Sequence, residues 1–300
     1  MELDITRKFV KAKRPCADGF RWFIKHFAQG GDYQELLDAL VEDGRVGDAC
    51  WLLDQFGPTH AVRVVEAVDA PALVFAGTLK VLGGVSVDQL LRVGGQLHVE
   101  GGVRAGHLAT PGEQAGLIAG DHVRVAGGLH VKGQTRVTGD LRVGWGVMAQ
   151  GPVYCEGDLL AGWELESHGR LEVHGNLRVG QSLDVQEDLR CEKSVQVQGP
   201  IDVAGQISVG HGLLADGDIQ CGFHLEAGWG VRSHGNIHVT ASLRVGEGIH
   251  AQGDISTGEG YGVYAGLAVH GESWETSAQV CSRRRPERLM SGFWVEDPSV

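Results

Sequence analysis

The chain has little proline, few aromatic residues and few cysteines. It holds 8 prolines and 47 glycines in 300 residues, and 6% of its residues are aromatic. The glycines do not recur at every third position, which together with the scarce proline excludes a collagen-like triple helix. The 6 cysteines are widely scattered and do not fit the disulfide framework of a small secreted protein.

Long apolar runs and an excess of positive charge are also missing. No run of about eighteen apolar residues occurs, so the sequence predicts no membrane span and no membrane partner. The N-terminal stretch MELDITRKFVKAKRP is basic but has no apolar core, so it does not resemble a signal peptide. The formal net charge of -12 lacks the basic footprint of a general nucleic-acid-binding protein. We therefore expect a cytoplasmic protein that binds no nucleic acid.

The abundant residues are glycine and aliphatic residues. Hydrophobic residues make up 42% of the chain, which is more than a disordered chain contains. Abundant glycine combined with a regular hydrophobic pattern indicates a repeat architecture with many tight corners.

Residues 1–70 are predicted to form a small α-helical domain. Apolar and aromatic residues recur there at helical spacing, and Asp32 followed by Glu35 has the spacing of a capping box, with Asp in place of Ser or Thr. The pattern predicts three helices, over 16–29, 33–44 and 46–57. We expect this domain to cap one end of the repeat region.

From residue 71 to residue 270 the sequence follows a six-residue repeat, with an irregular segment at 107–114. In the 26 blocks from Ala115 to His270 the third residue is Leu, Ile, Val or Tyr in every block but one, which has Thr135. The fifth residue is always small or β-branched, and the fourth is mostly polar. Such alternation predicts a short strand with two inward residues and one outward residue. The glycine and polar residues between the strands predict corners with unusual φ values.

Related blocks recur at every third block, as in GDLRVG, GDLLAG and GNLRVG, which begin at 139, 157 and 175. Three six-residue sides therefore make one coil, and stacked coils pair as parallel strands. The sequence predicts a mainly β protein, a three-sided parallel β-helix of about eleven coils over 71–270. A large inward residue precedes a small one, the reverse of left-handed hexapeptide helices, which together with the preference for right-handed crossovers predicts right-handed coils. Residues 271–300 lose the repeat and are predicted to be either a cap or a tail.

Residues three blocks apart should lie in columns along the faces of the β-helix. One column places three carboxylates on successive coils without a compensating cation, and further acids lie beside it. Stacked carboxylates repel one another, which favours protonation, a bound cation or a basic partner. A contrasting column carries Arg124, Arg142, Arg178 and Arg232. The predicted partner-binding residues are Glu164, Glu166, Asp184, Asp202 and Asp218; the alternative interpretation is charge that only keeps the sheet soluble.

Other residues give weaker indications. Trp145 and Trp163 are three blocks apart, so we expect their rings to stack at one corner. The inward cysteines Cys155, Cys191 and Cys221 should be buried and unpaired. No sequence motif indicates catalysis, a cofactor or a metal site, and no histidine follows another at a distance of three blocks.

The repeat over 71–270, with blocks such as GDLRVG and GNIHVT, resembles the bactofilins and related glycine-rich bacterial β-helix proteins. This resemblance implies a cytoskeletal, polymer-forming protein. We expect a non-enzymatic scaffold that binds a protein partner and self-associates as a homo-oligomer. One alternative is an acidic neutralising protein, an immunity protein or nucleic-acid mimic that occludes a basic toxin or enzyme. A more distant alternative is a hexapeptide-type acyltransferase, for which His107 in the irregular coil is the candidate catalytic residue.

Overall fold

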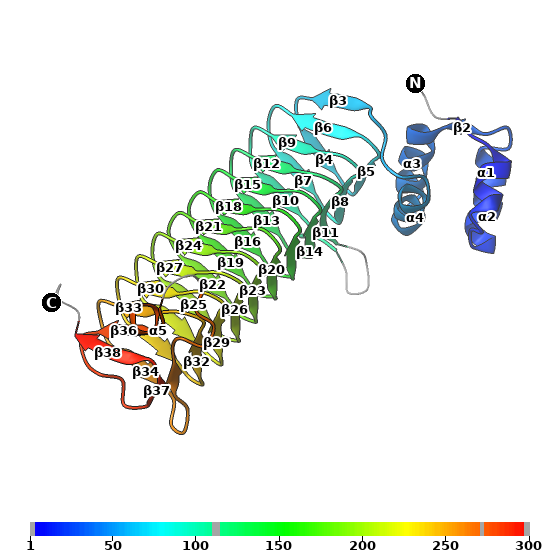
Figure 1. Ribbon diagram of the computed structural model, residues 1–300. Helices are drawn as coiled ribbons and strands as arrows, with labels where there is room; N and C mark the ends of the chain where they lie inside the picture. The colour runs from blue at the N-terminus through cyan, green and yellow to red at the C-terminus, as the bar shows by residue number, and fades with distance from the viewer. Residues whose placement is uncertain (1–3, 110–114, 271–272, 297–300) are drawn as a thin grey trace.

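The computed structural model describes residues 4–109, 115–270 and 273–296, and it confirms a parallel β-solenoid with a small N-terminal helical region (Figure 1). The solenoid has three parallel sheets, called here sheets I, II and III in the order in which the chain visits them. The chain runs from sheet I to sheet II to sheet III and returns to sheet I one coil further along. The right-handedness of the coil stays a prediction.

Within the described ranges, sheet I has 13 strands, sheet II has 11 and sheet III has 12. Sheet I contains β3 (Val62–Val65), β6 (Thr78–Val81), β9 (Leu97–Val99), β12 (Val123–Val125), β15 (Leu141–Val143), β18 (Leu159–Ala161), β21 (Leu177–Val179), β24 (Val195–Val197), β27 (Leu213–Ala215), β30 (Val231–Ser233), β33 (Ile249–Ala251), β36 (Gln279–Ser282) and β38 (Phe293–Glu296). Sheet II contains β4 (Val68–Ala70), β7 (Val85–Val87), β10 (Val103–Ala105), β13 (Leu129–Val131), β16 (Val147–Ala149), β19 (Leu165–Ser167), β22 (Leu183–Val185), β25 (Ile201–Val203), β28 (Ile219–Cys221), β31 (Ile237–Val239) and β34 (Ile255–Thr257). Sheet III contains β5 (Leu73–Phe75), β8 (Leu90–Val93), β11 (Gly116–Ala119), β14 (Gln134–Val137), β17 (Val153–Cys155), β20 (Leu171–Val173), β23 (Leu189–Cys191), β26 (Ile207–Val209), β29 (Leu225–Ala227), β32 (Leu243–Val245), β35 (Val263–Tyr264) and β37 (Leu289–Ser291).

Each regular strand buries its first and last residue and turns its middle residue outward. In β21, Leu177 is 0% exposed and Val179 is 2% exposed, whereas Arg178 between them is exposed. Leu177 pairs with Leu159 of the preceding coil and with Val195 of the next, so aliphatic side chains stack on aliphatic side chains. The interior is therefore one continuous aliphatic core along the solenoid.

Many corner glycines are required because successive coils lie very close together. At Gly162 a Cβ atom would lie 2.0 Å from the carbonyl oxygen of Gly144 in the coil below, and Gly180 has the same relation to Gly162. None of these three glycines has a positive φ. At these corners close backbone approach, rather than the expected unusual φ, explains the glycine.

The helical region consists of β1 (Asp4–Ile5), α1 (Arg7–Ala12), α2 (Ala17–His26), β2 (Gly31–Asp32), α3 (Tyr33–Glu42) and α4 (Val46–Phe56). The three predicted helices correspond to α2, α3 and α4, and the sequence analysis missed α1. Asp32 caps α3, because its carboxylate accepts hydrogen bonds from the backbone N–H groups of Gln34 (2.8 Å) and Glu35 (3.0 Å). The region has its own core, which also includes Val74, Leu90 and Ile118 from the solenoid.

Those three solenoid residues place the helical region on the outer face of sheet III, over β5, β8 and β11. It also covers the edge of β5, the first strand of that sheet. The Gln34 amide donates to the carbonyl oxygen of Val74 (2.9 Å) and accepts from the N–H of Ala76 (2.9 Å), as a neighbouring strand would. Among the described residues no strand precedes β3 in sheet I or β4 in sheet II. The hydrogen bonds of Gln34 therefore cover the first edge of sheet III only.

Arg63 covers the N-terminal end of the solenoid core. Its guanidinium carbon lies 4.8 Å from the centre of the Phe75 ring, and its Nη2 atom lies 3.6 Å from a carboxylate oxygen of Asp38 in α3. Phe75 is consequently 3% exposed although it lies in the first coil. The cation–π contact shields the open end of the core from water.

The solenoid is longer than the sequence predicted. Its first strand begins at Val62 rather than at residue 71, and its last strand ends at Glu296 rather than near residue 270. Sheet I accordingly indicates about 13 coils instead of eleven. Within the described part of 271–300, the short helix α5 (Trp274–Ser277) is followed by β36, β37 and β38, which extend sheets I and III.

Three irregular segments interrupt the coils between β6 and β36. One contains α5, and across it Ile249 pairs with Val280 rather than with Leu267, three blocks on, which is 47% exposed. The other two come earlier in the chain. The first is the predicted segment 107–114, of which residues 110–114 lie outside the described residues; across it Val103 pairs with Leu129 rather than with Asp121, three blocks on. The second was missed. Leu243 pairs with Val263 instead of Tyr261, so Val263 takes the inward position predicted for Tyr261, which is 41% exposed. The left-handed backbone of Gly260 (φ +86°) lies within this extra turn.

The alternation of buried and exposed residues can be tested with two adjacent positions. Leu177→Asp places an unpaired carboxylate in the aliphatic core and should lower the free energy of unfolding by about 3 kcal/mol or more. Arg178→Asp, on the outer face, should change it by less than about 0.5 kcal/mol. Urea unfolding followed by circular dichroism measures both. Equal losses of stability in the two variants would contradict the observed register.

Candidate functional site

The predicted acidic column lies on the outer face of sheet II. Glu166, Asp184 and Asp202 are the middle residues of β19, β22 and β25, and the register pairs Glu166 with Asp184 and Asp184 with Asp202. Met148 precedes this run and Gln220 follows it, so no cation occupies the adjacent positions of the column. The structure therefore brings the three carboxylates onto neighbouring strands of one face, as predicted.

Two of these carboxylates have polar neighbours that the three-block spacing of the sequence does not reveal. The Nε2 atom of His168 lies 2.7 Å from a carboxylate oxygen of Glu166, and the side-chain amide of Gln186 donates to Asp184 at 2.7 Å. Both neighbours come just after the strand, at the corner that follows it. Glu166 and Asp184 therefore have hydrogen-bonding partners that the sequence did not predict. Asp202 has no hydrogen-bond or ion-pair partner among the described residues.

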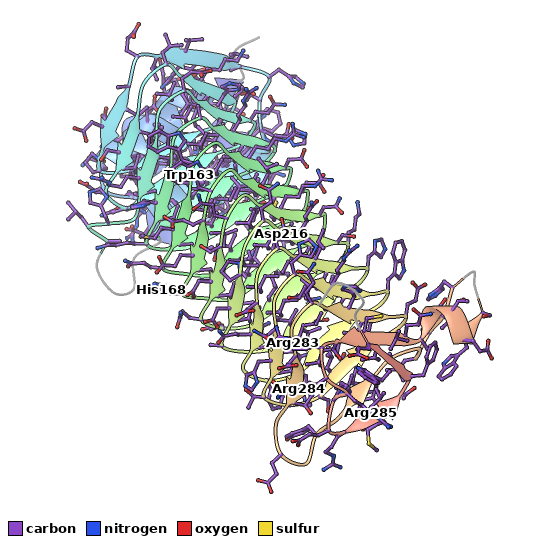
Figure 2. The ribbon with its side chains drawn as sticks, turned by 90° about the vertical axis from the view of Figure 1, so that its left-hand side faces the viewer. Trp163, His168, Asp216, Arg283, Arg284 and Arg285 are labelled. Atoms are coloured by element: carbon purple, nitrogen blue, oxygen red, sulfur yellow. The ribbon has the colours of Figure 1, made fainter. Side chains whose placement is uncertain are left out.

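Glu164 and Asp218 lie in one corner column, which leads into sheet II, three coils apart. Glu164 is exposed, and its side chain lies close to Gly146 in the preceding coil. Asp218 stabilises the fold, because its Oδ1 atom accepts hydrogen bonds from the backbone N–H (2.6 Å) and the side-chain amide (3.1 Å) of Asn236. Glu164 thus extends the acidic surface, whereas Asp218 is occupied within the fold. Figure 2 shows Trp163 and His168, the corner residues before and after β19, on the flank of the solenoid.

A basic column runs along the outer face of sheet I. The register pairs Arg124 with Arg142 and Leu160 with Arg178 along successive strands. Further along the column, Gln196 pairs with Leu214, which pairs in turn with Arg232. The column begins with Lys80, which pairs with His98, and it reaches His250 in β33. Adjacent faces of the solenoid therefore carry columns of opposite charge.

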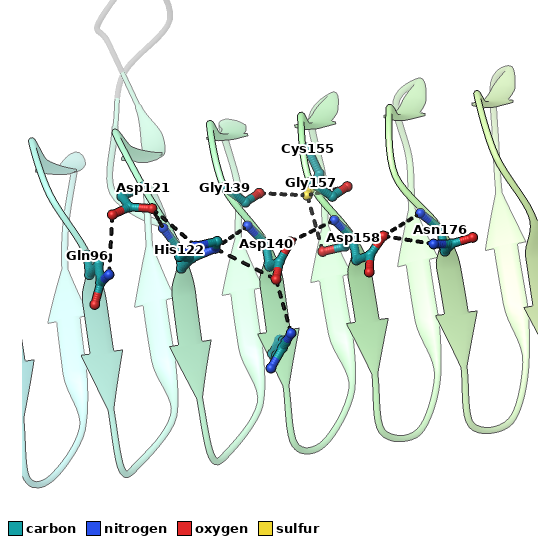
Figure 3. Close-up of polar contacts among 10 residues, drawn as sticks. Gln96, Asp121, His122, Gly139, Asp140, Cys155, Gly157, Asp158 and Asn176 are labelled. Carbon is teal, nitrogen blue, oxygen red and sulfur yellow. Dashed lines mark hydrogen bonds and ion pairs between the residues drawn. The ribbon is translucent and has the colours of Figure 1, made fainter.

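A ladder of side chains that the sequence did not predict holds the corner before sheet I together (Figure 3). The backbone N–H of Asp140 donates to Nδ1 of His122 (2.8 Å), and the backbone N–H of Asp158 donates to the Asp140 carboxylate (3.0 Å). The Asp158 carboxylate in turn accepts from the backbone N–H (2.7 Å) and side-chain amide (3.0 Å) of Asn176. Each polar side chain thus satisfies a backbone donor one coil further along.

At the other two corners, polar side chains likewise accept hydrogen bonds from backbone N–H groups of the next coil. Before sheet II, Asn236 accepts from the backbone N–H of Asp254 at 2.9 Å. Before sheet III, Asp188 accepts from the backbone N–H of Gln206 at 3.0 Å and from the Arg170 guanidinium at 3.0 Å. The available sequence signal was the second residue of each block, where Asp and Asn recur in Gly-Asp and Gly-Asn pairs. These residues hold the coils together.

The ladder makes Asp158 sensitive to acid. The hydrogen bond from the backbone N–H of Asn176 is the largest cause that holds the pKa of the Asp158 carboxyl below its usual value, and the Asn176 side chain adds to it. A lowered pKa in the folded state means that ionised Asp158 contributes stability above the ordinary pKa of aspartate. That contribution is lost as the pH falls through the lower, folded value.

Two variants of Asp158 test the ladder. Asp158→Ala leaves the Asn176 donors without their acceptor and should lower the free energy of unfolding by about 1–3 kcal/mol at pH 7. Asp158→Asn keeps an acceptor oxygen, so it should cost less, and its deficit relative to the unmodified protein should shrink below pH 4. Urea unfolding between pH 7 and pH 3 measures these differences. A deficit that does not depend on pH would argue against the ionised carboxylate as the acceptor.

The inward cysteines are buried, as predicted, and their thiols donate to corner carbonyls. The Cys155 Sγ atom lies 3.3 Å from the carbonyl oxygen of Gly139, and that of Cys191 lies 3.2 Å from the oxygen of Gly175. Burial raises the pKa of Cys155 and of Cys191 to about 11, and it also raises the pKa of Cys221. These thiols are therefore protonated and weakly nucleophilic at neutral pH.

Thiol labelling checks this burial. In the native protein at pH 8, N-ethylmaleimide should modify the exposed Cys16 within minutes and leave Cys155, Cys191 and Cys221 unmodified. All of them should react in denaturant, as read by peptide mass spectrometry. Native-state labelling of Cys191 at the rate of Cys16 would show that the core opens readily.

The predicted tryptophan stack is not formed. Trp163 donates its backbone N–H to the carbonyl oxygen of Trp145 (3.3 Å), so the two residues do lie on adjacent coils at one corner. Trp163 is 59% exposed and Trp145 is 67% exposed, and no ring contact joins them among the described residues. Trp229, at the corner before sheet I, instead stacks on His211 with ring centres 4.4 Å apart and planes 10° apart.

His107 lies where the irregular segment leaves sheet II. Its Nε2 atom lies 3.5 Å from a carboxylate oxygen of Asp88, and its buried Nδ1 atom has no hydrogen-bond partner among the described residues. Arg104, His130 and Lys132 line the adjacent hollow of about 250 Å³. The described residues of this hollow present cationic groups and the imidazoles of His107 and His130. Within the described ranges, no group of three or more His, Cys, Asp or Glu side chains could hold a metal ion.

Comparison with known proteins gives a match over the helical region. Residues 1–59 match the family model described as the YdhT N-terminal domain, and the match ends just before β3. No curated protein and no solved structure matches the chain. None of the helices formed by the described residues is long and apolar enough to cross a bilayer.

Proposed function

We propose that the protein is a non-enzymatic scaffold that binds a protein partner along the acidic column of sheet II. The observation that carries this proposal is the run of Glu166, Asp184 and Asp202 on three adjacent strands, with the exposed Glu164 beside it. A rigid solenoid fixes their separation at about 4.8 Å per strand. The surface is therefore preorganised, which lowers the entropic cost of binding.

The geometry fits a basic helix of a partner. Residues three or four apart on a helix lie about 5–6 Å from one another, close to the strand spacing of the acidic column. A helix with Lys or Arg at such positions, laid along the solenoid axis, pairs one cation with each carboxylate. Trp163, 59% exposed at the corner before β19, adds apolar contact area next to Glu164.

Self-association is the second part of the proposal. The likeness of the repeat to the bactofilins supports it, and so do the edges of β3 and β4, which no strand covers within the described residues. The cytoplasmic location stays a prediction. The acidic neutralising protein is the alternative that uses the same surface, since a basic toxin or enzyme would meet the same carboxylates.

The acidic column is tested by charge neutralisation. Glu166→Gln, Asp184→Asn and Asp202→Asn together should weaken binding of a fluorescent helical peptide with lysines at every fourth position by about tenfold at 0.1 M salt. The matched control is Glu172→Gln, Glu192→Gln and Glu226→Gln, which removes the same charge away from this face. Fluorescence anisotropy measures both. Equal weakening by the two triple variants would show that only the overall charge matters.

The oligomeric state of the unmodified protein separates the two functions. A scaffold should form dimers or larger assemblies on its own, as measured by light scattering after size-exclusion chromatography. A neutralising protein should stay monomeric and form a stoichiometric complex with one basic partner captured from its host. A protein that remains monomeric and inhibits such a partner would favour the neutralising function.

A further inference from the structure

The basic column of sheet I stands out in a protein with a net charge of -12. The middle positions of the ten strands from β6 to β33 carry five cations, two histidines and no carboxylate within the described residues. The five cations are Lys80, Arg124, Arg142, Arg178 and Arg232. Together these ten middle positions form what we call the sheet I strip.

Most of these cations are available to a ligand. Arg142 is paired with Asp140 at 3.0 Å. Lys80, Arg124, Arg178 and Arg232 have no ion-pair partner among the residues that the structure describes, and all four side chains are exposed. Arg178 lies close enough to Asp158 to lower the pKa of that carboxyl. Exposed cations in one row that form no ion pair attract a negatively charged chain.

The strip deepens into a groove near its C-terminal end. Gln196, Leu214, Trp229 and Arg232 line this groove, together with residues of α5 and β36. The groove is shallow and largely open to solvent, with a volume of about 580 Å³. The Trp229 ring is held by its stack on His211 and remains 48% exposed.

The side chains of the groove define the chemistry of its occupant. The Trp229 ring offers a flat apolar surface, and the Arg232 guanidinium offers two parallel donors for a carboxylate. The hydroxyl and amide groups of α5 and β36 offer donors and acceptors, and Glu247 at the corner offers a further acceptor. A ligand that matches all of these is a ring with an apolar face, several hydroxyl groups and a carboxylate.

We propose that the groove binds a uronic-acid unit and that the sheet I strip guides the rest of an acidic polysaccharide. The exposed cations that form no ion pair favour an anionic chain over a neutral one. A single-stranded nucleic acid is the competing anionic chain, and the binding test below distinguishes it from an acidic polysaccharide. The carboxylate of Glu247 can accept a hydrogen bond from a sugar hydroxyl.

Binding of polygalacturonate to the full-length protein tests this proposal. Isothermal titration calorimetry and tryptophan fluorescence should show binding at 0.05 M salt that weakens at 0.3 M salt. Arg232→Gln and Trp229→Ala should each weaken binding by about tenfold or more. Arg178→Gln should weaken binding of the polymer but leave a trigalacturonate unaffected, because Arg178 contacts the chain outside the groove. Neutral dextran of equal length should not bind.

The control is Arg190→Gln, which removes one outward arginine from sheet III, and it should bind as the unmodified protein does. Thermal melts establish that every variant is folded. The proposal is overturned if polygalacturonate does not bind, if Arg190→Gln weakens binding as much as Arg232→Gln, or if a single-stranded oligothymidylate binds more tightly than polygalacturonate.

Discussion

The rest of the structure depends on the stacking of coils in one register, in which most residues pair with the residue three blocks further along. This register places Leu177 on Leu159, Glu166 beside Asp184, and the Asp158 carboxylate beneath the backbone N–H of Asn176. Core, surface columns and corner ladder are therefore three results of one constraint. A shift of one residue would move the inward aliphatic residues to the surface and the charged ones into the core.

Much of the fold follows from the sequence because the repeat is simple. Strict alternation determines which residues face inward, and the three-block period determines which residues are neighbours, so the column of Glu166, Asp184 and Asp202 could be predicted. The neighbours of these carboxylates could not. His168 and Gln186 follow at the corners, where the directions of the side chains depend on backbone geometry that periodicity does not reveal. The shift in register that moves Tyr261 outward is equally invisible to a fixed period.

The placement of the helical region was also beyond the sequence. The amphipathic pattern of its helices predicts that they pack against another surface. Which surface that is depends on the side chains of both the helical region and the solenoid. Val74, Leu90 and Ile118 are aliphatic residues at outer positions of sheet III, which stand out only once the register is known. A hydrophobic pattern does not reveal the role of Gln34 in this placement. Its amide makes the hydrogen bonds that a neighbouring strand would make at the edge of β5.

The corner ladder has a consequence for how such a molecule changes over generations. A coil of the ladder presents a polar side chain on one side and a backbone donor on the other, so a duplicated segment of three blocks would bring both halves of the connection with it. Duplication within a gene could therefore lengthen the rod, and deletion shorten it, in whole coils without exposing an unsatisfied group at either junction. The helical region at one end and β38 at the other would keep their own structures, and only the distance between them would change. The number of three-block segments would then set the length of the solenoid.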